Sequence, residues 1–353
     1  MRRFCFALLL CACCFAAGAQ PRTIHVGGQT HHVQGIAYDA GKGRLYLSFT
    51  TRFIVADTLG NILGSIDRID GHLGAITFDP RSRCVYGTLE HKNDVIGSYI
   101  ARTLGGQDYT HPVFYVAKID VDAVTATGTP QQQALHYMEV VPAGQDHLAE
   151  VTLGDRTVRH RYGCSGIDGI TVAPGFGCDK GEYLYVAYGV YSDVDRTDND
   201  HQVLLQYSMR DVRKGRLRTP RKFFIHTGNT NFGVQNLAYD AHSGLLLMAV
   251  YKGKKTQYEN RDLYAVRMAS RPRRAALEGV PYKPHKATLI PLETGWHFAL
   301  GSFGLCPLGD GRWYFAKQRR QRNPATQKAE ESCDATLFQW SGAPDAPFRE
   351  AGD

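Results

Sequence analysis

Asp168 and Glu90 are the residues whose type and setting best suit acid–base chemistry. Asp168 lies in the string SGIDG (165–169), where glycines let the backbone approach a partner closely. Glu90 follows a β-prone run, in the string LEHKND (89–94). Two carboxyl groups on adjacent elements could act as acid and base on a glycosidic or phosphate-ester bond. The alternative is that Asp168 is a structural polar residue that fills the centre of the fold and is hydrogen-bonded to neighbouring blades.

A cation site is the second kind of chemistry that these residues allow. Gln34 and Gln235 hold positions equivalent to Asp168 in the repeat described below. Calcium prefers carboxylate and amide oxygens, so Asp168, Gln34 and Gln235 are candidate ligands of a central calcium ion. The acidic segment 193–200 lacks the glycine and terminal glutamate of an EF-hand loop, which favours a solvated turn. The cysteines and histidines show no spacing typical of zinc.

Further polar, cationic and aromatic residues are candidates for ligand binding at the same end of the fold. They are His32, Gln34, Arg52, His72, Tyr188, Gln235, Asn236, Lys252 and Lys317. Cations would favour carboxylate or phosphate groups, and a tyrosine could stack on a sugar or a base. Taken singly, each cation fits an ordinary exposed charge better, and tyrosines of this kind more often fill the gaps between blades. The sequence contains no P-loop, dinucleotide fingerprint or kinase motif.

An internal repeat places several of these residues at equivalent positions in the fold. Five segments share a small or polar residue followed by apolar and aromatic residues, at 34–39, 74–79, 168–172, 235–240 and 303–307. Short turns lead to second strands at 45–48, 85–88, 184–187, 246–249 and 313–316. Third strands are predicted at 53–57, 113–119, 202–207, 262–266 and 336–340, and fourth strands at 61–66, 134–141, 222–226 and 287–292.

The repeat predicts an all-β fold, a five-bladed β-propeller of four-stranded antiparallel blades. The fifth unit lacks a fourth strand, so the segment 23–26 is expected to close the last blade. Helical periodicity is nearly absent, which argues against a parallel α/β fold. A sixth blade would need a further unit within 100–165, where 151–160 could form only an extra hairpin.

Three strings resemble exported bacterial β-propeller proteins without an established role: VQGIAYD (33–39), GCSGIDGI (163–170) and RTDND (196–200). The resemblance covers nearly the whole chain after the first residues and implies no particular chemistry. The predicted architecture is also similar to five-bladed furanosidases and calcium-dependent nucleotidases. The furanosidases use three carboxylates around the funnel, whereas only two can be placed in this sequence.

Long loops between second and third strands should gather on one face of the propeller. They are predicted at 91–112, 189–201, 252–261 and 317–334, whereas the loops after the first strands are short. Binding residues concentrate on long loops carried by a rigid scaffold. We therefore expect the working end of the molecule there, around a central funnel.

The first 19 residues are typical of a signal peptide: two arginines, a short apolar run and the small-residue site AGA (17–19). Residues 20–353 would then form one secreted or periplasmic domain; lipoprotein anchoring is the weaker alternative. Without Arg2 and Arg3, the chain has 39 basic and 34 acidic side chains, a net charge of +5. This spread-out charge predicts no nucleic-acid partner, and the lack of a later apolar span predicts no transmembrane segment. A monomer is expected.

Three functions remain open from the sequence. The first is binding of a small polar or anionic ligand, glycan-like or phosphorylated, in the funnel, with calcium as a potential ordering ion. The second is a hydrolase using Glu90 and Asp168. The third is a protein-interaction platform built from the long loops.

Overall fold

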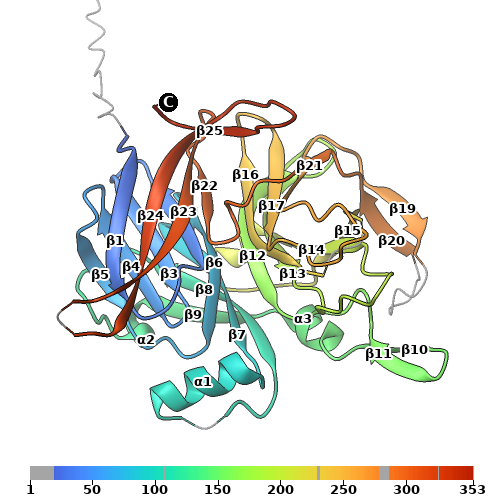
Figure 1. Cartoon of the computed structure of the whole chain (residues 1–353), viewed down its shortest axis with the longest axis horizontal. Helices are drawn as coiled ribbons and strands as arrows, with labels where there is room; N and C mark the ends of the chain where they lie inside the picture. The colour runs from blue at the N-terminus through green and yellow to red at the C-terminus, as the bar shows by residue number, and fades with distance from the viewer. Residues whose placement is uncertain (1–19, 107, 229–230, 278–285, 325, 353) are drawn as a thin grey trace, which may run out of the picture.

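Antiparallel sheets surround a common axis in the computed structural model, which describes residues 20–352 except 107, 229–230, 278–285 and 325 (Figure 1). Blade one contains β2 (Gly35–Asp39), β3 (Arg44–Phe49), β4 (Arg52–Asp57) and β5 (Ile62–Ile66). Blade two contains β6 (His72–Asp79), β7 (Cys84–His91), β8 (Val113–Asp120) and β9 (Leu135–Glu139). Blade three contains β12 (Ile167–Gly175), β13 (Asp179–Tyr188), β14 (His201–Ser208) and β15 (Arg221–His226).

The last two blades follow the same plan. Blade four contains β16 (Val234–Asp240), β17 (Leu245–Val250), β18 (Leu263–Arg267) and β21 (Thr294–Trp296). Blade five contains β22 (Leu305–Pro307), β23 (Arg312–Arg322) and β24 (Ala329–Trp340). The inner strands contact one another in the closed order β2, β6, β12, β16, β22 and back to β2. The predicted five-bladed propeller is therefore confirmed.

Strand β1 (Thr23–Gln29) pairs antiparallel with β24 on its outer side. In Figure 1 this first strand, in blue, lies beside the red strand of blade five. Ile24 and Val26 on β1 are buried, and they belong to the hydrophobic cluster between blades five and one. A short strand, β25 (Phe348–Glu350), pairs with the remaining length of the same edge of β24.

Aspartates at the ends of inner strands organise the turns and join blades. Oδ1 of Asp39 accepts the backbone N–H groups of Gly41 and Lys42, which fixes the turn into β3. Arg83 of blade two donates to Oδ2 of Asp39 at 2.6 Å. Arg213 of blade three reaches Asp79 of blade two in the same way, at 2.8 Å. The repeat therefore encodes both the turn and a clamp between successive blades.

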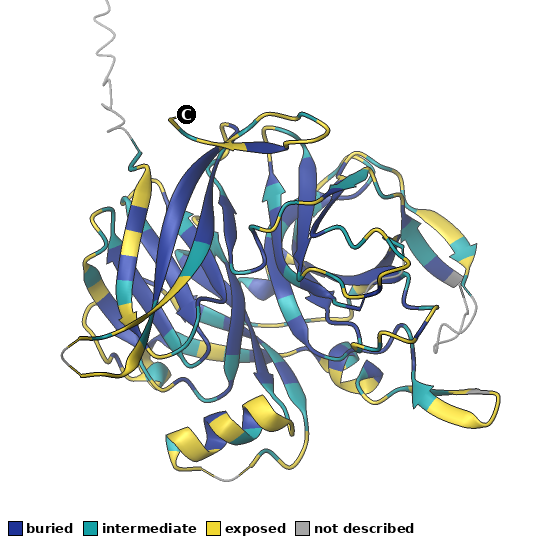
Figure 2. Cartoon of the chain, in the orientation of Figure 1, coloured by how far each residue is buried: buried dark blue, intermediate teal, exposed yellow. Residues whose placement is uncertain are grey.

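Apolar clusters fill the interfaces between blades. Phe114 of blade two packs in one cluster with Val186 of blade three, and Leu47 of blade one packs in another with Tyr314 of blade five. Each fully buried side chain of this size contributes about 1.5–3 kcal/mol to stability. Figure 2 shows the blade strands largely buried, whereas the hairpin of β10 (Glu150–Leu153) and β11 (Arg156–Arg159) is largely exposed.

One strand prediction and one loop prediction are wrong. The segment 287–292 was expected as the fourth strand of blade four, but β20 (Lys286–Ile290) pairs parallel with β15 of blade three and antiparallel with β19 (Arg273–Ala276). Strand β21 takes the fourth position in blade four. The segment 317–334 was expected as a loop, but most of it extends the β23–β24 hairpin, in which Lys317 pairs with Asp334. Strand β23 ends at Arg322, and β24 begins at Ala329.

Helices occur only as insertions in the described chain. The longest, α1 (Val95–Leu104), lies in the connection between β7 and β8 and stands apart from the blades at the lower edge of Figure 1. None of the described helices is long and apolar enough to cross a membrane. The cysteines at 84, 164, 178, 306 and 333 are free thiols, and Cys178 is exposed.

Candidate functional site

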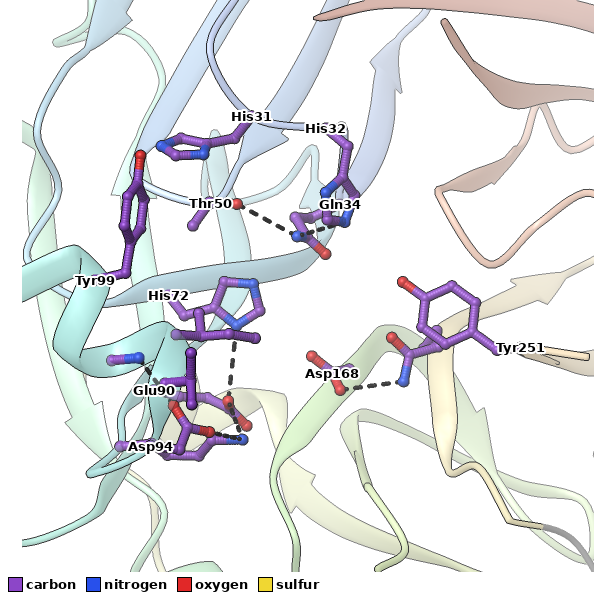
Figure 3. Close-up of a pocket in the computed structure, with 15 residues that line it drawn as sticks. His31, His32, Gln34, Thr50, His72, Glu90, Asp94, Tyr99, Asp168 and Tyr251 are labelled. Carbon is purple, nitrogen blue, oxygen red and sulfur yellow. Dashed lines mark hydrogen bonds and ion pairs between the residues drawn. The ribbon is translucent and has the colours of Figure 1, made fainter. Parts of the chain in front are cut away.

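A cavity of about 480 Å³ lies at one end of the central channel, where blades one to four meet. Figure 3 shows side chains from different blades converging on it. Its lining residues are His31, His32, Gln34, Thr50, His72, Glu90, Lys92, Asp94, Val95, Ile96, Gly97, Tyr99, Asp168, Gln235 and Tyr251. This volume is within the usual range of small-molecule sites.

Irregularities in three inner strands place the central polar residues. The register of β6 with β7 shifts between Leu73 and Ile76, and that of β12 with β13 between Ile167 and Ile170. A third shift lies between Val234 and Asn236. Asp168 and Gln235 sit within these interruptions. Bulges of this kind redirect side chains and are common beside functional sites.

Glu90 is the centre of a buried ionic network. It is 3% exposed, and its Oε2 lies 3.2 Å from Nζ of Lys92 and 3.7 Å from Nδ1 of His72. Its Oε1 accepts the backbone N–H of Ile167. A Cβ at Gly166 would lie 2.4 Å from that oxygen, so any larger residue there would displace the carboxylate of Glu90. The network ties blade two to the inner strand of blade three.

The network displaces the pKa values of its members. Burial by itself would raise the pKa of Glu90, but the charges of Lys92 and His72 outweigh burial and lower it. Burial likewise opposes protonation of His72, yet the hydrogen bond and charge of Glu90 raise the pKa of His72. The carboxylate and the imidazolium therefore stabilise each other.

Asp168 is the carboxyl group at the centre of the cavity. Its Oδ2 accepts Nε2 of Gln235 at 3.3 Å, and its backbone carbonyl accepts Oγ1 of Thr88 at 2.9 Å. A Cβ at Gly74 would lie 3.3 Å from Oδ1, so glycine leaves room beside the carboxyl group. Burial, followed by the negative charge of Glu90, raises the pKa of Asp168 to about 6. Asp168 therefore changes protonation close to physiological pH.

Helix α1 forms an apolar wall over the cavity. Asp94 caps the helix by accepting the N–H of Gly97 at 2.8 Å, and Arg68 donates to the carbonyl of Leu104 at the other end. Val95 is 84% exposed and Tyr99 is 51% exposed. Both line the cavity, so the helix offers it apolar surface that the protein itself leaves uncovered.

His31, His32 and Tyr251 complete the lining of the cavity. The ring of His31 meets that of Tyr99 edge-on at 5.8 Å (Figure 3). Burial, and secondly the charge of His72, lower the pKa values of His31 and His32. These two rings are therefore neutral at pH 7. Burial raises the pKa of Tyr251 to about 12, so its hydroxyl keeps its proton.

The structure brings together six of the residues predicted from sequence and adds others. Gln34, His32, His72, Asp168 and Gln235 line the cavity together with Glu90. Gln34 donates from Nε2 to His32 and Thr50. The sequence prediction did not include His31, Thr50, Lys92, Asp94, Tyr99 and Tyr251, nor the other residues of α1.

Other predicted residues lie elsewhere. Arg52 is held by Asp67 and Gln29, and Nζ of Lys317 lies 2.6 Å from Glu350. Neither lines the cavity, and the exposed Lys252 does not line it either.

Tyr188 and Asn236 have internal partners instead. The buried Tyr188 donates to Asp146 at 2.8 Å, within the cluster between blades two and three. Asn236 is 3% exposed and donates to the carbonyls of Gln34 and Ser302, which joins three inner strands around the axis. Both side chains therefore pack inside the ring rather than against the cavity.

The predicted calcium ligands lie near one another, but they supply a single carboxylate. Asp168 and Gln235 are hydrogen-bonded, and Gln34 lines the same cavity. Within the ranges that the structure describes, no group of three or more His, Cys, Asp or Glu residues is arranged to hold a metal. In the acidic segment, Arg196 pairs with Asp198 and His201 with Asp200. Calcium binding by Asp168, Gln34 and Gln235 stays a prediction.

Comparisons with known proteins do not assign a family. No family model and no curated protein sequence matches the chain. Among solved structures, the β-propeller domain of Cps50 (Swd1) from Myceliophteria thermophila is similar with 8% identity and a TM-score of 0.32, over 86% of this chain and 82% of that one. A gluconolactonase from Xanthomonas campestris gives 11% identity and a TM-score of 0.33, over 89% of each chain. At these values neither protein's function carries over to this chain.

Proposed function

We propose that the cavity binds a small, uncharged, hydroxyl-rich ligand such as a sugar unit. The observation that carries this proposal is the division of the cavity lining. Asp168, Gln34 and Gln235 supply hydrogen-bonding groups at the floor, and Tyr99 with Val95 supplies an exposed apolar wall. A sugar ring offers both faces at once, since its hydroxyl groups seek polar partners and its C–H face packs on aromatic rings.

Charge favours a neutral ligand over an anionic one. Arg52, Lys252 and Lys317 were expected to give the funnel a positive rim, but they lie outside the cavity lining. Lys92 does line the cavity, and its Nζ lies 3.2 Å from a carboxylate oxygen of both Glu90 and Asp94. Its charge is therefore largely compensated, and Asp168 adds negative charge above pH 6. A concave site of this kind also favours ligand binding over a flat interaction platform.

Calorimetric titration of the purified protein with neutral mono- and oligosaccharides tests this proposal. Gln235→Ala should weaken binding by about tenfold, because it removes a hydrogen-bonding group beside Asp168. Lys252→Ala is the matched control on the same blade, and we expect it to bind as the wild type does. Binding of phosphate esters with no binding of neutral sugars would contradict the proposal.

Hydrolysis is a second candidate, favoured by the displaced pKa values. Asp168, with a pKa of about 6, is mostly ionised at pH 7, and the hydrogen bond and charge of Glu90 raise the pKa of His72, which favours the protonated imidazole. These two cavity residues could serve as base and acid. Glu90 would act as a positioning residue rather than a proton-exchanging one, because its oxygens are engaged by Ile167, Lys92 and His72.

Turnover of glycosides and esters separates this candidate from binding alone. A true hydrolase should lose about 100-fold or more of its kcat in Asp168→Asn. Glu90→Gln should instead move the alkaline limb of the pH profile to lower pH, because His72 loses the partner that raises its pKa. Sugar binding without turnover of any such substrate would leave the binding function and exclude the hydrolase.

A further inference from the structure

A second concave site, unrelated to the cavity, lies at the outer part of blade three. Arg210, Lys214, Arg216 and Arg218 surround a hollow of about 230 Å³ together with Asp211. They belong to the short helix α4 (Met209–Val212) and to the connection that leads into β15. All four cationic side chains are exposed.

The positive charge of this hollow is poorly compensated. Arg218 pairs with Asp211 at 3.3 Å. Arg210, Lys214 and Arg216 form no ion pair with any acid in the described ranges. Like charges held together repel one another, and the repulsion is relieved when a counter-charge binds between them.

The backbone that carries these cations is anchored. Met209 and Val212 are fully buried in the cluster between blades two and three. Arg213 points away from the hollow and clamps Asp79 and Glu182. Lys118 donates to the carbonyl of Arg213 at 2.7 Å. The turn at Gly215 has a φ of 74°, which glycine adopts without strain.

We infer that this hollow binds a phosphate or sulfate group, free or carried on a polymer. Guanidinium groups donate paired hydrogen bonds to tetrahedral oxyanions, and a lysine ammonium adds a compact charge. An anchored turn loses little conformational freedom when the anion binds. None of the residues around this hollow lines the cavity, so the two sites are separate.

A charge-matched pair of variants tests the site. Arg210→Gln/Lys214→Gln/Arg216→Gln removes three charges from the hollow, and Arg271→Gln/Arg273→Gln/Arg274→Gln removes three exposed charges around β19. Inorganic phosphate is titrated by calorimetry at constant ionic strength, and a sulfated oligosaccharide such as a heparin fragment is titrated in parallel. The wild type should bind one of these probes with a Kd below about 5 mM.

The expected result is a loss of about tenfold in affinity in the first variant and an unchanged affinity in the second. Asp211→Asn should strengthen binding, because it removes the acid that competes for Arg218. Phosphate binding identifies a small-anion site, and binding of the heparin fragment alone identifies a polymer site. No binding of either probe, or equal losses in both triple variants, would overturn the inference. Melting temperatures of all variants verify that the ring is intact.

Discussion

Nδ1 of His72 lies 3.7 Å from Oε2 of Glu90, so a nearly buried carboxylate holds an imidazole that lines the cavity. The same oxygen lies 3.2 Å from Nζ of Lys92. The pair therefore couples the stability of blade two to the charge state of the site.

Glu90→Gln should destabilise the protein by about 3 kcal/mol at pH 7, because Lys92 and His72 would lose a partner inside the fold. The pKa of Glu90 is lowered by folding, so its stabilisation is present above its ordinary value of 4.5 and is lost as pH falls through the folded pKa. Urea unfolding at pH 7 and at acidic pH should show that the difference in free energy of unfolding between variant and wild type shrinks as pH falls. Glu259→Gln, which changes a largely exposed carboxylate, is the control and should have little effect.

The same substitution should lower the pKa of His72. Proton NMR of the imidazole through a pH titration measures this directly. In the wild type, the raised pKa means that the contribution of His72 to stability is present below pH 6.5 and is lost as pH rises through the folded pKa. A pKa of His72 that does not change in Glu90→Gln would show that Glu90 does not control the imidazole.

Asp168→Asn should stabilise the protein while impairing the site. Folding raises the pKa of Asp168 from 3.8 to about 6. The protein therefore loses stability as pH rises from about 4 to above 6, because the carboxyl group ionises less readily in the folded state. We expect the melting temperature of the variant to exceed that of the wild type by about 2–4 °C at pH 7.5 and by nothing at pH 3.5. A lower melting temperature at pH 7.5 would mean that the carboxylate is satisfied by a partner.

Calcium binding is tested with the same variant. If Asp168 ligates the ion, millimolar calcium raises the melting temperature of the wild type relative to EDTA, and the increase disappears in Asp168→Asn. Magnesium is the control cation, because it demands a tighter octahedral arrangement. An unchanged wild-type melting temperature in calcium would remove this ion from consideration.

Tyr99→Ala should weaken ligand affinity by about tenfold and leave the melting temperature unchanged, because the ring is half exposed on the cavity wall. Leu59→Ala removes an exposed apolar side chain that does not line the cavity and serves as the control. Titration of both variants with the same sugar measures the difference. Equal affinity in the two variants would contradict a role for α1 in binding.

Ile24→Ala should cost about 2–4 kcal/mol, because the side chain is buried between blades five and one. Thr23→Ala alters an exposed neighbour on the same strand and should be nearly neutral. Chemical unfolding of both variants measures the contribution of β1 to the last blade. If both variants unfold like the wild type, the pairing of β1 with β24 contributes little in solution.

The repeat predicted the ring because each blade must bury the same faces, and every inner strand is found at its expected place. On the second strands, the prediction of cavity residues was correct for Glu90 and missed the cavity by one position for Tyr188 and Lys317. Tyr188 and Lys317 are each the fourth residue after the first aligned residue of their strand, whereas Thr50, Glu90 and Tyr251 are the fifth. Side chains alternate between faces of a sheet, so a step of one residue moves a side chain from the blade interface to the cavity.

Helix α1 was missed for a different reason. It is a single insertion, so the repeat contains no information about it. The sequence contained local signals for this helix: an aspartate at its N-terminal end (Asp94) and a glycine at its C-terminal end (Gly105), which takes the left-handed conformation. The partnerships of Arg52 with Asp67 and of Lys317 with Glu350 depend on contacts between distant segments, which no local pattern reveals.

The pairing of β1 with β24 also has a consequence for how the chain reaches its final form. His25 and its partner Asp334 are separated by 309 positions, so β1 must pair with a strand from a distant part of the chain. Contacts between such distant segments form slowly, because a large loop must close first. Until that loop closes, Ile24 and Val26 have no partner strand, and exposed apolar strands of this kind favour aggregation.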